Sequence, residues 1–204
     1  MIESAATVEE IRESYGEVSS LARDKVQPRL DKHARAFIAR SPFLVLGTAD
    51  ADGRQDVSPR GDPPGFVKVL DDRTLLLPDR PGNRRIDSLS NIAAHPNVSL
   101  LFIVPGFDDT LRVNGKARIT RDPELLRDLA VDGKPALSAL VIAVEEAFMH
   151  CAKAFIRSRL WDPKARQDRK EFPSLGRIIA DQIAGVDAEE ADRNIDHAYR
   201  ADLY

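Results

Sequence analysis

Between residues 43 and 148 the hydrophobic positions come in short runs that are typical of β-strands. Some runs alternate with polar residues and others are continuously apolar, and clusters of Gly, Pro and Asp separate them. We expect strands over residues 43–48, 55–59, 65–70, 74–77, 98–104, 109–120 and 139–148. The pattern over 109–120 alternates throughout and is the longest of these signals.

Helical spacing of apolar positions is found mainly outside this region. Residues 3–40 are expected to be helical, with Thr7 and Glu10 forming a capping box and a break near Pro28. Among and after the strands, the pattern predicts helices over residues 86–94, 123–129, 151–158, 175–184 and 188–203.

Six or seven strands at short spacing, joined by hairpin turns and with few helices between them, predict an antiparallel barrel. The chain is therefore expected to be mainly β with flanking α-helices. We expect one domain over residues 1–204, with its core at about residues 40–150 and helical extensions at both ends. A Rossmann fold is disfavoured because strands and helices do not alternate and no G-x-G-x-x-G motif is present.

Composition narrows the classes of partner. The formal net charge is −3, so no global basic field exists to hold nucleic acid or anionic lipid. The first ten residues have neither the basic segment nor the apolar core of a signal peptide, and the longest apolar runs are too short to span a bilayer. A single cysteine, Cys151, excludes an internal disulfide. We expect a cytoplasmic protein that binds neither nucleic acid nor membranes.

Three arginines, a glycine and an asparagine crowd into Pro78-Asp-Arg-Pro-Gly-Asn-Arg-Arg85, directly behind an apolar strand. A strand that ends in such a turn and then opens a helix leaves backbone N–H groups uncovered at the helix start. With Asn83 as the predicted N-cap, Arg84 and Arg85 would form a compact phosphate site beside these donors. The alternative is a basic surface turn that leads into an amphipathic helix.

A second candidate is the segment from Asp56 to Gly65, in which three prolines follow directly on a strand. Proline has no backbone N–H, so we expect this segment to leave the ladder as a stiff loop that fixes Ser58 and Arg60 at the barrel rim. Their side chains would contact a flat polar ring system or its phosphate. The alternative is a rigid surface loop with an ordinary exposed arginine.

The third candidate is the segment from Phe148 to Trp161, which includes His150, Cys151, Lys153 and Arg157. On a helix Lys153 and Arg157 share a face. The other histidines are scattered along the chain, so we expect no metal centre. Cys151 would need a depressed pKa to act as a nucleophile. The alternative, favoured for this segment taken alone, is that Cys151 packs as a small hydrophobic residue and Lys153 is solvated.

Taken together and in order, these segments resemble the pyridoxamine 5′-phosphate oxidase-like family of FMN-binding split barrels, over roughly residues 40–165. The resemblance is closest to the branch with a His-Cys-x-Lys-Ala segment after the last barrel strand. The motifs that carry it are Ser58-Pro-Arg60, Pro81-Gly-Asn-Arg-Arg85, Asn91 to Pro96 before the strand from Val98, Thr110-Leu-Arg-Val-Asn-Gly115, and His150-Cys-Ala-Lys-Ala154.

The resemblance implies a six-stranded antiparallel split barrel and a homodimer with FMN at the subunit interface. Asn83, Arg84 and Arg85 match the family's Ser-Arg-Lys phosphate grip, and Thr110 falls where the oxidases carry a flavin-contacting glutamine. The resemblance also implies that His150 and Lys153 approach the flavin from the neighbouring subunit. The cofactor-binding residues that it implies are Val57, Ser58, Pro59, Arg60, Asn83, Arg84, Arg85, Thr110, His150 and Lys153.

The expected activity is that of an FMN-dependent oxidoreductase acting on a small molecule. The true oxidases end in a substrate-binding Arg-Leu-x-Pro-type tail, whereas this chain ends in an acidic helix from Asp187 to Tyr204, so oxidation of pyridoxamine phosphate itself is not expected. Alternatives are a non-catalytic flavin-binding or stress-response protein, and a relative that uses deazaflavin or haem. A nucleic-acid or protein-interaction module would need a basic face or an exposed apolar patch.

Overall fold

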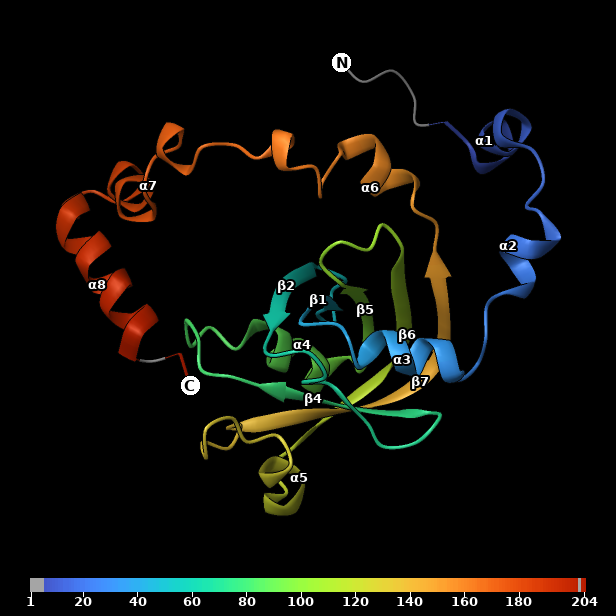
Figure 1. Cartoon of the computed structure of the whole chain (residues 1–204), viewed down its shortest axis with the longest axis horizontal. Coiled ribbons are helices and arrows are strands. Elements are labelled where there is room, and N and C mark those ends of the chain that lie inside the picture. Colours follow the sequence, from blue (N-terminus) through green and yellow to red (C-terminus); the bar gives the residue numbers. More distant parts are fainter. Residues whose placement is uncertain (1–5, 202) are drawn as a thin grey trace.

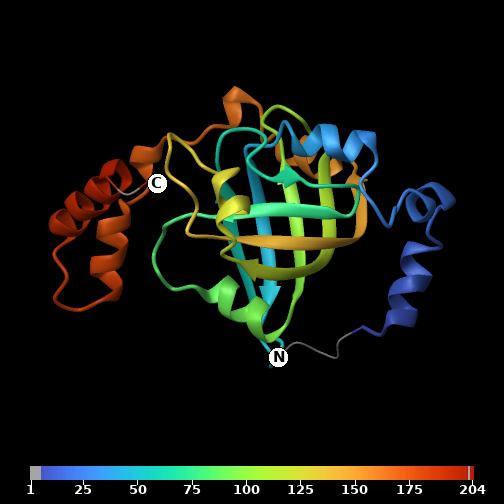
Figure 2. The ribbon, with the colours of Figure 1, turned by 90° about the horizontal axis from the view of Figure 1, so that it is seen from below.

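The computed structural model of the chain describes residues 6–201 and 203–204. One antiparallel sheet has the strand order β2-β1-β5-β6-β7-β4-β3 and curls around an apolar core (Figures 1 and 2). The strands are β1 (Phe43–Ala49), β2 (Gln55–Gly61), β3 (Lys68–Val69), β4 (Thr74–Asp79), β5 (Asn97–Ile103), β6 (Thr110–Thr120) and β7 (Ser138–His150).

The predicted mainly β, antiparallel architecture is confirmed, but the sheet has seven strands and not the six that the family resemblance implied. The seventh is β3, which pairs only two residues with β4. The predicted strand over 65–70 is this short because Phe66 and Val67 turn into the core instead of joining the ladder.

The segment after Asp56 does not leave the ladder at Pro59, as the sequence predicted. Instead β2 continues to Gly61, and Pro59 lies opposite Val45 of β1. The prediction was wrong because β2 is an edge strand, where a missing N–H group is tolerated.

The core fills the inside of the curled sheet with leucine, isoleucine, valine and phenylalanine. Leu44 and Leu46 of β1, Leu100 and Phe102 of β5 and Ile142 of β7 are fully buried. The helix α3 (Lys32–Ile38) closes one end of this core with Phe37 and Ile38. The longest strand is β7 and not the predicted 109–120, because β7 pairs with β6 along nearly its whole length and with β4 on its other side.

The region before the sheet holds three short helices, α1 (Val8–Tyr15), α2 (Ser20–Asp24) and α3. The predicted capping box of Thr7 and Glu10 is confirmed, and Gly16 ends α1. Pro28 lies between α2 and α3, where a break was predicted. Residues 3–5 of the predicted helical region lie outside the described residues.

Short helices also follow the strands. Within the sheet region these are α4 (Asp87–Ala94) and α5 (Pro123–Arg127). After β7 come α6 (Lys153–Ser158), the 3-10 turns η1 (Pro163–Ala165) and η2 (Arg169–Glu171), then α7 (Leu175–Gln182) and α8 (Ala188–Ala201). Residue 202 of the last predicted helix lies outside the described residues. None of the helices described is long and apolar enough to cross a membrane.

Candidate functional site

A chain of polar side chains links β2 to α4 and to the end of β4. Because side chains of a strand alternate, Asp56, Ser58 and Arg60 share one face of β2, and all three are half-buried. Ser88 of α4 donates to Asp56 Oδ2 at 2.7 Å, and its Oγ lies 3.1 Å from that of Ser58. Arg60 Nε donates to Ser58 Oγ at 3.3 Å.

This chain also joins the two ends of the curled sheet. Arg60 Nη1 of β2 donates to Asp79 Oδ1 of β4 at 2.6 Å, and both side chains are less than one-fifth exposed. No ladder hydrogen bonds connect β2 with β3 or β4 among the described residues. The ends of the sheet therefore meet through side chains, and they meet where Ser58 and Arg60 were predicted to act.

Residues 57–60, which were predicted to line the flavin, do not all face the same side of β2 because side chains alternate along a strand. Val57 and Pro59 point to the opposite face of β2 from Ser58 and Arg60, and both are exposed. The structure thus brings Ser58 and Arg60 into the polar chain and leaves Val57 and Pro59 outside it.

The loop between β4 and α4 carries the three arginines that the sequence singled out. Arg80 is largely buried: its Nε donates to Asp62 Oδ2 and its Nη2 to the Leu129 carbonyl, each at 2.7 Å. Arg80 therefore fastens the loop to the body. Arg84 and Arg85 are exposed, and the Arg84 guanidinium makes no hydrogen bond or ion pair with any described residue.

Helix α4 begins at Asp87, one residue later than predicted, and its N-cap is not the residue that was predicted. Asn83 is not the N-cap; its Oδ1 accepts from the Arg85 N–H at 3.1 Å and so forms a tight turn before the helix. Ile86 is the N-cap and provides no side-chain hydrogen bond to the first turn. The orphan N–H groups of α4 are therefore left for another acceptor, beside Arg84 and Arg85.

The backbone of this loop is strained at two positions. Arg84 has φ +61° and Ile86 has φ +54°, in the left-handed region that side chains with a Cβ avoid. Such conformations cost about 1–3 kcal/mol each and cluster at ligand-binding sites. A bound group that accepts hydrogen bonds from the N–H groups at the start of α4 would offset the free energy of these left-handed conformations.

The remaining predicted residues form a second group, at the start of β6 and the end of β7. Thr110 lies opposite His150 in the ladder, and Thr110 is buried. The His150 ring packs on Phe148, with ring centroids 4.9 Å apart. Arg112 and Lys25 also lie over the Phe148 ring, at 4.4 and 5.5 Å from its centroid.

His150 is shifted toward its neutral form. Burial lowers its pKa, and the charges of Arg112 and Lys25 lower it further. A neutral imidazole both donates and accepts one hydrogen bond, which suits contact with a polar heterocycle.

Beyond β7 the chain turns outward. Lys153 opens α6 and shares its face with Arg157, and both are exposed, as is Cys151. The thiol is therefore not packed in the core, contrary to the alternative given above. Within residues 6–201 and 203–204, no group of three or more His, Cys, Asp or Glu side chains could hold a metal ion.

The structure thus brings Ser58 and Arg60 together beside α4 and places Thr110 opposite His150, whereas Val57, Pro59 and Lys153 are exposed outside both groups. No hydrogen bond or ion pair joins the two groups among the described residues. Asp56, Ser88 and Asp79 complete the first group but were not predicted as site residues. The spacing of Asp56, Ser58 and Arg60 at every second position could have identified Asp56 as part of the site.

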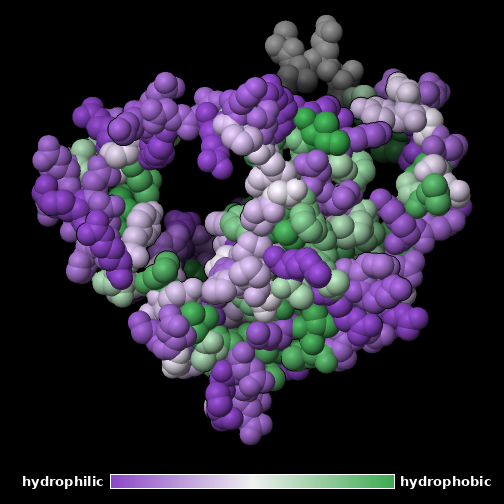
Figure 3. Space-filling view, viewed as in Figure 1, coloured by the Kyte–Doolittle hydropathy of each residue, from purple (hydrophilic) through white to green (hydrophobic). Residues whose placement is uncertain are grey.

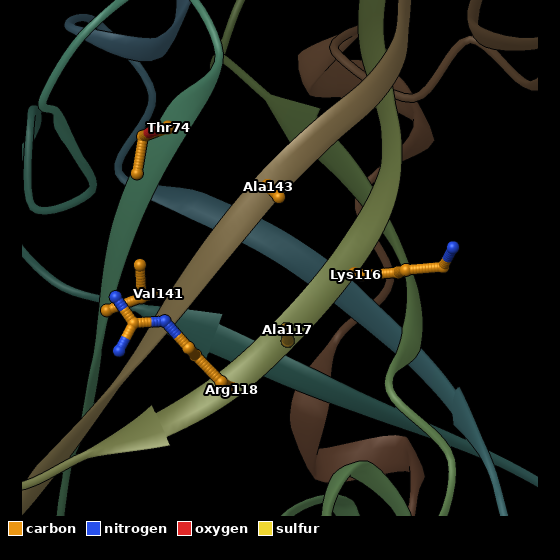
Figure 4. A pocket seen from close by; sticks show the side chains of 6 residues that line it. All are labelled: Thr74, Lys116, Ala117, Arg118, Val141 and Ala143. Carbon is orange, nitrogen blue, oxygen red and sulfur yellow. The ribbon is translucent and has the colours of Figure 1, made fainter.

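A groove with a volume of about 330 Å³ lies elsewhere, on the outer face of β4, β7 and β6. Figure 4 shows its floor of small and apolar side chains with Lys116 and Arg118 projecting from β6. The residues that line it are Thr74, Lys116, Ala117, Arg118, Val141 and Ala143. None of the predicted site residues contributes to it.

Comparison with known proteins places the chain in a recognised group. The family model described as pyridoxamine 5′-phosphate oxidase matches residues 30–151. A HupZ variant from Group A Streptococcus is similar in structure, with 17% identity and a TM-score of 0.50, over 59% of this chain and 99% of that one. At this identity the likeness concerns the fold.

Two further solved structures are more distant. An FMN-binding protein from Syntrophomonas wolfei is 13% identical with a TM-score of 0.46, over 71% of this chain and 97% of that one. General stress protein 26 from Bacillus anthracis is 17% identical with a TM-score of 0.43, over 56% and 88% of the two chains. No curated protein matches the chain.

Proposed function

Because the chain belongs to the pyridoxamine 5′-phosphate oxidase family, we propose that it binds FMN and acts as an FMN-dependent oxidoreductase on a small molecule. We further propose that its sheet forms the split barrel of that family. Its working form would be a homodimer in which FMN lies between the subunits. Pyridoxamine phosphate is not the substrate that we propose, since the segment that follows β7 forms α6, α7 and α8 and does not match the substrate-binding motif of the true oxidases.

One observation carries this proposal: the uncapped start of α4 lies beside two exposed guanidinium groups. A phosphate dianion needs N–H donors and positive charge together, and the first turn of α4 with Arg84 and Arg85 provides both. Asp87 competes for Arg85, whose Nε donates to it at 2.7 Å. Arg84 is free of such a partner among the described residues and is the stronger phosphate candidate.

The other predicted residues would hold the rest of the cofactor. Ser58 and Arg60 lie next to α4 through Ser88 and would contact the ribityl chain or the near edge of the ring. Thr110 lies opposite His150 in the ladder, and Lys153 follows at the start of α6. We propose that these residues reach the flavin of the neighbouring subunit. Two copies would then complete two sites.

FMN, when bound, supplies the hydride chemistry of the reaction. The chain's own side chains would position the ring and stabilise charge on its pyrimidine side, for which Lys153 and Arg157 are the cationic candidates. The lowered pKa of His150 would keep that side chain a neutral hydrogen-bonding group near the substrate.

Replacing Arg84 tests the phosphate assignment. We expect Arg84→Ala to weaken FMN binding by about 1.5–3 kcal/mol, the usual value of a hydrogen bond to a charged group, or about ten- to a hundredfold in affinity. Quenching of flavin fluorescence during titration measures it. Arg121→Ala, which removes an exposed arginine after β6, is the matched control. An Arg84→Ala affinity equal to that of the control would remove Arg84 from the site.

A further inference from the structure

The segment that follows β7 returns to the body of the molecule at Tyr204 (Figure 1). Tyr204 Oη donates to Asp62 Oδ1 at 2.7 Å, and Lys134 Nζ donates to the Tyr204 backbone oxygen at 3.2 Å. The Arg80 guanidinium lies over the Tyr204 ring, 5.5 Å from its centroid. The phenol, the ring and the backbone of Tyr204 are thus all contacted by residues that are distant from it in the sequence.

Tyr204 is also the point at which this segment is fastened. Within the described part of residues 163–203, no residue forms a hydrogen bond or an ion pair with the sheet or with the helices before β7. Trp161, which donates to the Phe107 carbonyl at 2.8 Å, marks the other end of this stretch. Helices α7 and α8 bond to each other, and Figure 3 shows open space between them and the body.

The carboxylate that accepts from the phenol is buried. Only 1% of the Asp62 side chain is exposed, and its Oδ2 accepts from Arg80 Nε at 2.7 Å. Its Oδ1 accepts from no side chain but Tyr204 among the described residues. Because a buried carboxylate oxygen without a donor is unfavourable, loss of the phenol would drive Asp62 toward water or toward another donor. The position of Arg80 would change with it.

The pair of Asp62 and Arg80 also continues the link between the two ends of the sheet. Arg60 of β2 pairs with Asp79 of β4, and Asp62, just after β2, pairs with Arg80, just after β4. The charges are reversed from one pair to the next, so like charges would meet if the two segments slid past each other. Together the two pairs fix where the chain leaves β4 relative to β2.

The loop of residues 80–86, which we call the phosphate loop, is fastened at both of its ends. Arg80 holds the first end, and Ser88 of α4 holds the second through its hydrogen bonds to β2. Between them Arg84 and Ile86 have left-handed backbone conformations, which persist only where surrounding contacts impose them. Release of Arg80 would let these two residues relax and would move Arg84 away from the N–H groups at the start of α4.

We propose that Tyr204 is a positioning residue for phosphate recognition: through Asp62 and Arg80 it holds the phosphate loop in the conformation that binds the phosphate of FMN. The inference rests on the proposed function for the identity of the ligand. Docking of the segment that ends at Tyr204 is thereby coupled to the cofactor site, and the coupling acts in both directions. The hydrogen bond to Asp62 raises the pKa of the Tyr204 phenol, so the phenol stays protonated and able to donate at neutral pH.

The variant Tyr204→Phe tests the proposal, because it removes the phenol hydroxyl and keeps the ring. We expect its affinity for FMN to fall about fivefold or more and its affinity for riboflavin to stay unchanged, since riboflavin has no phosphate for the loop to hold. Quenching of flavin fluorescence during titration of the full chain measures both. The matched control is Tyr199→Phe, which removes a hydroxyl from an exposed tyrosine of α8 and should change neither affinity.

An FMN affinity of Tyr204→Phe equal to that of the control overturns the proposal. Equal losses of affinity for FMN and for riboflavin also overturn it, because they would mean a general loosening of the structure and not a misplaced phosphate loop.

Trypsin cleavage without any ligand separates this proposal from the proposed function. Trypsin cuts after arginine, and cleavage after Arg84 or Arg85 requires the phosphate loop to open. We expect this cleavage, followed by mass spectrometry, to be about fivefold or more faster in Tyr204→Phe than in Tyr199→Phe. Equal rates overturn the proposal even in a chain that binds FMN. Faster cleavage in a chain that never binds FMN would refute the proposed function and leave the role of Tyr204 in place.

Discussion

Arg84 and Ile86 occupy left-handed backbone conformations on either side of Arg85, at the point where the chain enters α4. Neither residue is a glycine, so the turn imposes strain that a purely structural connection could have avoided. The turn directs the Asn83 side chain to the backbone of Arg85 and leaves the first N–H groups of α4 without a side-chain acceptor. The strain is thus placed where a phosphate would be held.

The environment of His150 predicts how the free energy of unfolding depends on pH. Its pKa is lowered in the folded chain, so the unfolded chain takes up a proton first as the pH falls below about 6.5. The free energy of unfolding should therefore decrease as the pH falls below about 6.5. The variant His150→Gln, which cannot take up this proton, should lose that part of the decrease.

Urea denaturation at a series of pH values measures this dependence, with His33→Gln, a change of an exposed histidine on α3, as the control. Equal pH dependence in the wild-type chain and in His150→Gln would show that the imidazole is not held neutral by its surroundings.

Part of the candidate site could be predicted from residue types alone. Guanidinium groups beside a turn and a helix start indicated a phosphate site, and the exposed Arg84 and Arg85 are at that place. Sequence could not predict that Arg80, which lies in the same loop as Arg84 and Arg85, forms an ion pair with Asp62. The partner lies on a different segment, so the difference between the arginines comes from tertiary structure.

At the scale of elements, the β6–β7 pair depends on Gly115. A β-bulge shifts the register between Asn114 and Gly115, and it brings the Ala143 carbonyl of β7 against the place where a Cβ would be. Any side chain at this position would overlap that oxygen, so the two long strands could keep their pairing only with a glycine there.

We therefore expect Gly115→Ala to lower the free energy of unfolding by about 1–3 kcal/mol, the usual cost of overpacking. Thermal and urea denaturation measure it. The control is Gly82→Ala, since a Cβ at Gly82 would meet no atom within 4 Å. A Gly115→Ala chain as stable as this control would mean that the bulge adapts without cost.

The elements that sequence predicted best are those with strong local patterns. The alternation of apolar and polar residues identified the long strands, and the capping box of Thr7 and Glu10 identified the start of α1. Pro59 misled the prediction because proline excludes a central strand but not an edge strand, and only the sheet order shows that β2 is at the edge. The two-residue β3 has too few paired residues to leave a periodic signal.

At the scale of the whole molecule, the chain consists of a curled sheet and two helical arms that extend from it on different sides (Figures 1 and 2). The sequence predicted that the arms are helical, but not what their apolar side chains contact. In one chain those faces contact solvent, and the two groups of site residues remain apart. Both features have the same explanation if two copies form the functional unit.

The central claim is that this chain holds the phosphate of FMN at the start of α4. Titrating the full-length chain with FMN and with riboflavin, which has the same ring and ribityl chain but no phosphate, tests it most directly. We predict that FMN binds about ten- to a hundredfold more tightly than riboflavin. Equal affinities for the two, or binding of neither, would contradict the account.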